Sequence, residues 1–80
     1  MNRVLESLMI VKPVVDEQAF LSSQDLYGEG ILDSLDILML VKELEATFRV
    51  VISATSLTRS DFMTIADIGE LVKRHGGLIE

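Results

Sequence analysis

The hydroxyl of Ser34 is the side chain best placed for chemistry, because it stands where turn residues give way to a helical pattern. A catalytic serine needs a base to accept its proton and a donor group to hold an oxyanion. The single histidine, His75, is far along the chain, and Gly-x-Ser-x-Gly is absent. The carboxylates of Asp33 and Asp36 would also repel an anionic intermediate. We therefore do not expect an enzyme.

A helix cap is the structural alternative for the same residues. Ser34 or Asp33 would accept a hydrogen bond from a backbone N–H of the first turn, which typically stabilises a helix by about 1 kcal/mol relative to alanine. Both residue types are common at helix starts. The serine alone therefore does not distinguish a cap from a functional site.

The run after Ser34 carries more large apolar side chains than one core contact needs. On a helix, one face of this run is a full apolar stripe, made of Ile37, Leu40, Val41, Leu44 and Phe48. Leu35 and Met39 fall on the opposite face, and exposed apolar groups rimmed by charge are typical of a docking surface. The alternative is a helix buried on nearly all sides. We expect a partner-docking surface that comprises Asp33, Leu35, Asp36, Leu38, Met39, Lys42, Glu43 and Glu45.

These residues resemble a known family, the acyl and peptidyl carrier proteins. The attachment motif and second helix of that family are similar to Asp33-Ser34-Leu35-Asp36 followed by Leu40-Val41, Leu44-Glu45 and Phe48. The resemblance extends over residues 25–72 and is weak before about Phe20. It implies a small helical bundle with a covalent 4'-phosphopantetheine arm on Ser34, which a phosphopantetheinyl transferase moves there from coenzyme A.

The resemblance also implies a function. The thiol of the arm carries an acyl or aminoacyl group as a thioester between loading and transferring enzymes of a biosynthetic pathway. Departures from fatty acid carriers indicate a stand-alone D-alanyl, aminoacyl or otherwise specialised carrier. Gly30 is one residue further from Ser34 than in fatty acid carriers, Met39 stands where they have an acidic residue, and Lys42 replaces an apolar one. The cargo, the pathway and the loading enzyme stay open.

The 80 residues make one domain, residues 1–80, with a small core. Apolar residues make up 49% of the chain and aromatic residues 5%, which suits a helical domain packed with Leu, Ile and Val. The absence of cysteine excludes a disulfide framework and a thiolate-based zinc site. It also means that any thiol for a thioester must be imported.

The net charge of −6 argues against nucleic acid as a partner, because binding to phosphates requires Lys and Arg. It favours basic protein partners, although acidic residues also simply keep a small domain soluble. No signal peptide is evident, and the apolar runs are far shorter than the ~20 residues that a membrane span needs. We expect a cytoplasmic monomer with no membrane span.

The helical patterns predict an all-α bundle of three main helices and one short helix. The first helix runs from about Asn2 to Val11 and ends before Pro13. The second contains residues 35–48. Thr64 begins the third, with Asp67 three positions later in a capping-box-like arrangement, and Gly76-Gly77 ends it.

The connecting segments are less regular. Residues 14–21 could resume as helix, and their apolar side chains must find cover. Residues 50–52 form an extended loop that crosses the core, because a lone strand is not stable. Ser56 is expected to start the short helical turn through Thr58, with Phe62 in the core, and His75 is expected to be solvated.

Two other functions are compatible with an acidic segment of this kind. An unmodified acidic helical interaction module could use the same face to bind a basic partner. A calcium loop over residues 25–36 fits poorly, since Tyr27 occupies its third position and Asp36 replaces the bidentate Glu at its end. We therefore expect no metal.

Overall fold

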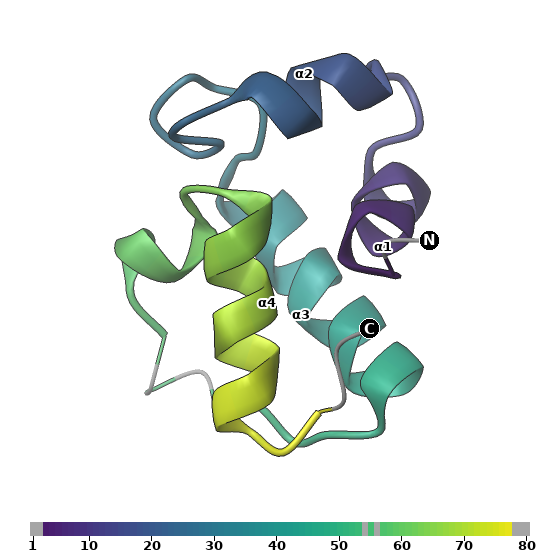
Figure 1. Cartoon of the computed structure of the whole chain (residues 1–80), viewed down its shortest axis with the longest axis vertical. Coiled ribbons are helices and arrows are strands. Elements are labelled where there is room, and N and C mark those ends of the chain that lie inside the picture. The colour runs from purple at the N-terminus through teal and green to yellow at the C-terminus, as the bar shows by residue number, and fades with distance from the viewer. Residues whose placement is uncertain (1–2, 54, 56, 78–80) are drawn as a thin grey trace.

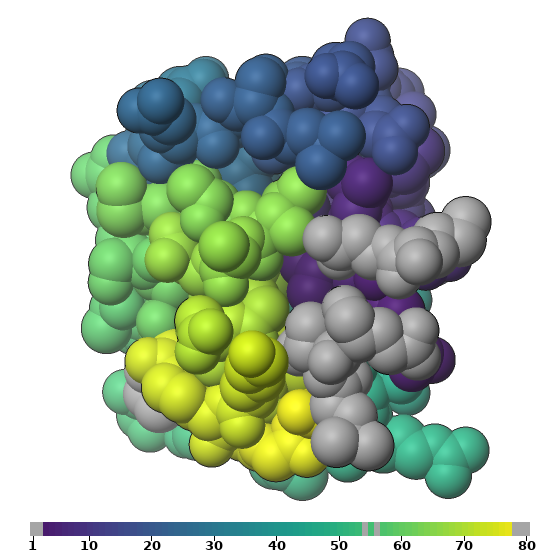
Figure 2. Space-filling model, in the orientation of Figure 1, coloured from purple at the N-terminus to yellow at the C-terminus, as the bar shows by residue number. Residues whose placement is uncertain are grey.

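The computed structural model describes residues 3–53, 55 and 57–77. Its elements are α1 (Arg3–Val11), α2 (Glu17–Ser22), α3 (Ser34–Phe48), the 3-10 helix η2 (Arg59–Phe62) and α4 (Ile65–Arg74). The described residues contain no strand, so the expected all-α bundle with three main helices is confirmed. α1 packs against α3, and α2 crosses the upper end of the bundle (Figure 1). In the same view, side chains of α2 form the upper edge of the surface, above those of η2 and α4 (Figure 2).

The short helices differ from the sequence prediction. The segment after Pro13 resumes as helix only at Glu17, where the carboxylate of Asp16 accepts a hydrogen bond from the Gln18 N–H at 3.1 Å. The turn predicted for residues 56–58 is instead η2, which starts one residue after Thr58. Asp61 sets this start, because its carboxylate accepts the Thr58 N–H at 2.9 Å. Asn2 and Ser56, where two predicted helices began, lie outside the described residues.

One hydrophobic core joins all of these elements. The stripe predicted on α3 is confirmed, because four of its five side chains are buried and Ile37 packs partly against them. Phe62 is also buried, as expected. The core consists of Val4, Leu5, Leu8, Phe20, Leu26, Leu32, Leu40, Val41, Leu44, Phe48, Ile52, Phe62, Ile68, Leu71 and Val72.

The prediction that the apolar side chains of residues 14–21 are buried is only partly confirmed. Phe20 is buried and Val15 packs against the core, but Val14 is 89% exposed and Leu21 is 50% exposed. Val14 lies in the turn before α2, and the six residues of α2 place one large side chain, Phe20, fully inward. In the extended loop at residues 50–52, Ile52 is buried in the core, Val50 packs partly against it and Val51 is exposed.

The last helix begins and ends near the predicted residues. The Thr64 hydroxyl accepts the Asp67 N–H at 3.1 Å and donates to the Asp67 carboxylate at 2.9 Å. Gly76 has a φ of +92°, which ends the helix in a backbone conformation that glycine adopts readily. His75 is half-buried, with Nδ1 2.9 Å from the Leu71 carbonyl oxygen, so the prediction of a solvated histidine was wrong.

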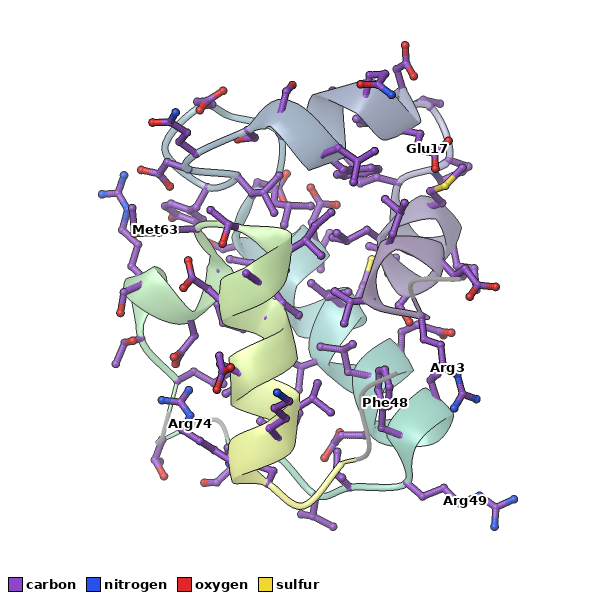
Figure 3. All side chains as sticks on the ribbon, in the orientation of Figure 1. Arg3, Glu17, Phe48, Arg49, Met63 and Arg74 are labelled. Carbon is purple, nitrogen blue, oxygen red and sulfur yellow. The ribbon has the colours of Figure 1, made fainter. Side chains whose placement is uncertain are left out.

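Interactions between elements hold the helix ends together. The Arg3 guanidinium of α1 lies over the Phe48 ring of α3, 5.5 Å from its centroid (Figure 3). The Arg74 guanidinium of α4 pairs with the buried Asp61 carboxylate of η2. Burial would raise the pKa of Asp61, but the Thr58 N–H and Arg74 outweigh it and hold that pKa below its ordinary value.

Leu26 anchors the loop that leads into α3. Its side chain is fully buried, and its N–H donates to the Met63 carbonyl at 2.8 Å. Its own carbonyl accepts the N–H groups of Ile31 and Leu32, both at 3.0 Å. The position of residue 34 is therefore tied to the junction between η2 and α4.

Truncation of this anchor should be costly. We expect Leu26→Ala to lower the free energy of unfolding by about 2–5 kcal/mol, because it leaves a cavity in a packed core. Val51→Ala is the matched control, since Val51 is 84% exposed and its truncation should change stability by less than about 0.5 kcal/mol. Urea unfolding of both variants checks the prediction, and equal effects would contradict it.

Candidate functional site

Ser34 is the first residue of α3, and its side chain is exposed. The cap belongs to Asp33, whose carboxylate accepts the Asp36 N–H at 2.9 Å. The Asp36 carboxylate in turn accepts the Asp33 N–H at 3.0 Å, which completes a capping box. Of the two cap residues considered from the sequence, Asp33 takes that role, so the Ser34 hydroxyl is not used to cap the helix.

Asp36 does not lie on the exposed rim where the sequence placed it. It is only 7% exposed, and Lys12, just beyond α1, contacts its carboxylate at 2.8 Å. Burial would raise the pKa of Asp36, but the Lys12 ammonium and the Asp33 N–H outweigh burial and lower it below its ordinary value. The same contact with Asp36 raises the pKa of Lys12. Asp36 therefore fastens the start of α3 to the end of α1.

Tyr27 makes a side-chain contact with Ser34. Its hydroxyl lies 3.3 Å from Ser34 Oγ, and either oxygen can donate the hydrogen bond. The Arg59 guanidinium lies over the Tyr27 ring, 5.4 Å from the centroid, and pairs with Asp25 at 3.2 Å. Side chains from the loop, from η2 and from the start of α3 thus meet at one place.

Gly28 makes room for this arrangement. A Cβ atom at position 28 would lie 2.1 Å from Asp25 Oδ2 and 2.7 Å from Arg59 Nη2. The Asp25 carboxylate also accepts the Gly28 N–H at 2.8 Å. The ion pair between Asp25 and Arg59 therefore lies directly against the loop backbone, and a side chain at position 28 would require these two side chains to shift.

Tyr27 and Arg59 also line a cavity of about 320 Å³. Its walls are mostly apolar, and Arg59 and Thr58 add polar groups to them. The residues that line it are Tyr27, Ile37, Leu57, Thr58, Arg59 and Phe62.

The apolar side chains predicted for docking lie on the surface of α3. Leu35 is 65% exposed, Leu38 55% and Met39 46%, and Lys42 is exposed beside them. We call these four residues the α3 outer face. Glu43 and Glu45 border it and are half-buried: Glu43 accepts a hydrogen bond from Thr47 Oγ1 at 3.3 Å and Glu45 accepts the Ile52 N–H at 2.9 Å.

Acidic side chains of the segment considered for calcium have partners within the protein. Asp25 pairs with Arg59 and Asp36 with Lys12. In the part of the chain that the structure describes, no group of three or more His, Cys, Asp and Glu side chains could hold a metal ion. Within the same residues, the helices are too short or too polar for any of them to span a membrane.

Sequence reasoning missed most partners of these groups. The spacing of Thr58 and Asp61 is a capping-box signal that could have located η2. The contacts of Arg59 with Asp25 and of Lys12 with Asp36 join residues far apart in the chain, so no local sequence pattern predicts them.

Comparisons with known proteins identify D-alanyl carrier proteins as relatives. The chain is 32% identical over 54 residues to the D-alanyl carrier proteins of Streptococcus pyogenes serotype M5 (strain Manfredo), serotype M49 (strain NZ131) and serotype M1. The matched segment covers 68% of this chain and 68% of each relative. No family model matches the chain, and no solved structure matches it significantly.

Acid should remove the stabilisation that ionised Asp36 provides. Because the pKa of Asp36 is lower in the folded protein than in the unfolded chain, this contribution is present above the unfolded value of about 3.9 and is lost as the pH falls through the folded value. Lys12→Gln raises the folded pKa and should flatten the fall in unfolding free energy below about pH 5. Part of the fall should remain, because Asp61 contributes with the same sign.

Urea unfolding at a series of pH values measures this dependence. Lys42→Gln is the matched control, because Lys42 is an exposed lysine of α3 and its loss should leave the slope as in the wild type. A Lys12→Gln variant with the full wild-type slope would show that Lys12 does not set the pKa of Asp36.

Proposed function

The chain belongs to the acyl and peptidyl carrier protein family, and from this premise we propose that Ser34 carries a covalent 4'-phosphopantetheine arm. Carrier proteins are not enzymes, so the chemistry belongs to the arm and to partner enzymes. The observation that carries the proposal is the exposed Ser34 hydroxyl at the first residue of α3, with the cap supplied by Asp33. A visiting enzyme can modify this oxygen without breaking a hydrogen bond of the helix cap.

The residues around Ser34 suit a phosphodiester. The first turn of α3 supplies the positive end of a helix macrodipole, which stabilises a negative group. The capping box fixes the backbone there, so that attachment does not require the helix to unwind. The arm supplies a thiol that holds the cargo as a thioester, a group that a chain without cysteine lacks.

The α3 outer face is the proposed docking site for the transferase and for the loading and transferring enzymes. Its apolar side chains begin next to Ser34, so that an enzyme bound there has the attachment site within reach. Asp33, Glu43 and Glu45 add acidic groups around it, and the net charge of −6 favours basic partner surfaces. Asp36 is left out of this site because it is buried and paired with Lys12.

We propose that the cargo is an acyl or aminoacyl group of a specialised pathway outside bulk fatty acid synthesis. The support comes from the relatives, which are named as D-alanyl carriers, and from the motif departures at Gly30, Met39 and Lys42. The intact mass of the protein isolated from its own cells would report both the arm and any cargo retained on it.

Loading of Ser34 tests the attachment directly. The purified chain is incubated with coenzyme A, magnesium and a broad-specificity phosphopantetheinyl transferase, and its intact mass is measured. We expect the wild type and Ser60→Ala, a variant of another exposed serine, to gain one phosphopantetheine mass, and Ser34→Ala to gain none. Because Ser34 is exposed and does not cap the helix, Ser34→Ala should change stability by less than about 0.5 kcal/mol.

A wild-type protein that gains no mass, or a Ser34→Ala protein that is still modified, would contradict the proposal. An unmodified chain that still binds a basic partner through the α3 outer face would be an interaction module instead.

Truncation of the α3 outer face should slow loading. We expect Leu35→Ala combined with Met39→Ala to lower kcat/KM of the transferase by about tenfold, because truncating well-packed interface residues costs about 1–2 kcal/mol. Ile10→Ala is the control, since Ile10 is 64% exposed on α1 and Leu35 is 65% exposed. Equal rates for the double variant and the control would exclude this face as the docking site.

A further inference from the structure

The contacts beside Ser34 link its hydroxyl to a cation. Tyr27 touches Ser34 Oγ with its hydroxyl and supports the Arg59 guanidinium on its ring face. A ring stacked in this way holds a guanidinium in place while leaving its edge free to bind an anion. The tyrosine therefore brings a hydrogen-bonding hydroxyl and a positive charge to the same side of the start of α3.

Arg59 forms an ion pair with Asp25 that another anion can replace. Its Nη2 atom lies 3.2 Å from Asp25, and its side chain is 62% exposed. A guanidinium carries five N–H donors, and an exposed pair of this kind is weak. Arg59 can therefore turn from the Asp25 carboxylate to another anion at small cost.

The start of α3 needs such a cation once it carries a phosphate. Asp33 and Asp36 place two carboxylates within two residues of Ser34. Lys12, which lies near them, contacts the Asp36 carboxylate at 2.8 Å and is held there. A phosphodiester on Ser34 would therefore add negative charge beside carboxylates, and Arg59 is the cation that Tyr27 connects to this oxygen.

We propose that Tyr27 and Arg59 form the binding site for the phosphodiester on Ser34, with Asp25 as the anion that holds Arg59 ready before the arm is attached. This inference rests on the proposed attachment of phosphopantetheine. In the modified protein the Tyr27 hydroxyl donates to a phosphate oxygen, and Arg59 exchanges the Asp25 carboxylate for the phosphate. The root of the arm is then held on the side of α3 where Tyr27 and Arg59 line the cavity.

Phosphorus NMR of the loaded protein tests the contact, because the phosphodiester contains the one phosphorus atom of the arm. The wild type and four variants are loaded with coenzyme A and a transferase: Arg59→Gln, Tyr27→Phe, Asp25→Asn and Arg49→Gln. Arg49 is the matched control, since it is an exposed arginine at the opposite end of α3 from Ser34. We expect the phosphorus chemical shift to change in Arg59→Gln and Tyr27→Phe and to stay as in the wild type in Arg49→Gln.

Unfolding midpoints of each variant before and after loading give a second readout. Exchange of one exposed pair for a stronger one should raise the wild-type midpoint on loading by about 1–4 °C at low salt, and added salt should reduce the gain. Arg59→Gln should lose this gain. Asp25→Asn removes the competing carboxylate, keeps an oxygen that can accept the Gly28 N–H, and should show a larger gain than the wild type.

Tyr27 also reports its own surroundings, since the chain has one tyrosine and no tryptophan. Loading should change the intrinsic fluorescence of the wild type, and Arg59→Gln should change that response. If every variant is loaded at Ser34 and all share the wild-type phosphorus shift and the same gain in midpoint, the phosphodiester site is wrong and the attachment stands. If Ser34 is not loaded in any of them, the attachment and this site are both wrong.

Discussion

The capping box of Asp33 and Asp36 is the interaction on which the rest of the site depends. Each carboxylate accepts the backbone N–H of the other residue, so the start of α3 is satisfied without the serine between them. Lys12 neutralises the buried member of the pair and ties it to the end of α1. Because Asp33 and Asp36 cap the helix and Lys12 neutralises Asp36, the Ser34 hydroxyl remains an exposed group on a fixed backbone.

The same device recurs where η2 begins. Asp61 accepts the Thr58 N–H, is buried, and pairs with Arg74 of α4, just as Asp36 accepts the Asp33 N–H and pairs with Lys12. In both places a local cap becomes a tertiary contact, because a buried carboxylate requires a cation from another element. Paired charges as well as apolar burial therefore hold the loops that precede α3 and η2 in position.

Sequence reasoning located the elements whose pattern is local. The apolar period of α3, the cap at Thr64 and the glycine that ends α4 lie in single segments, and each followed from a few neighbouring residues. The proposed attachment motif is local as well, because Asp33, Ser34, Leu35 and Asp36 are contiguous, and its role stays a prediction. Asp36 was misplaced on the exposed rim, since its burial depends on Lys12, which the pattern of α3 does not contain. The cluster of Asp25, Tyr27 and Arg59 was not predicted for the same reason, because only the fold brings Arg59 to the other two residues.

α3 has one apolar face in the core and another apolar face exposed at the surface, and its position in the bundle explains how both can exist in a small domain. One face fills the core with Leu40, Leu44 and their neighbours, so the helix is held from a single side. The side chains of the α3 outer face therefore need not contribute to folding, and they can stay apolar and exposed. Such a surface would favour self-association in a neutral protein, whereas the net charge of −6 opposes contact between copies. The acidity and the exposed apolar groups of α3 are thus physically coupled, because the charge offsets the tendency of such a face to associate with itself.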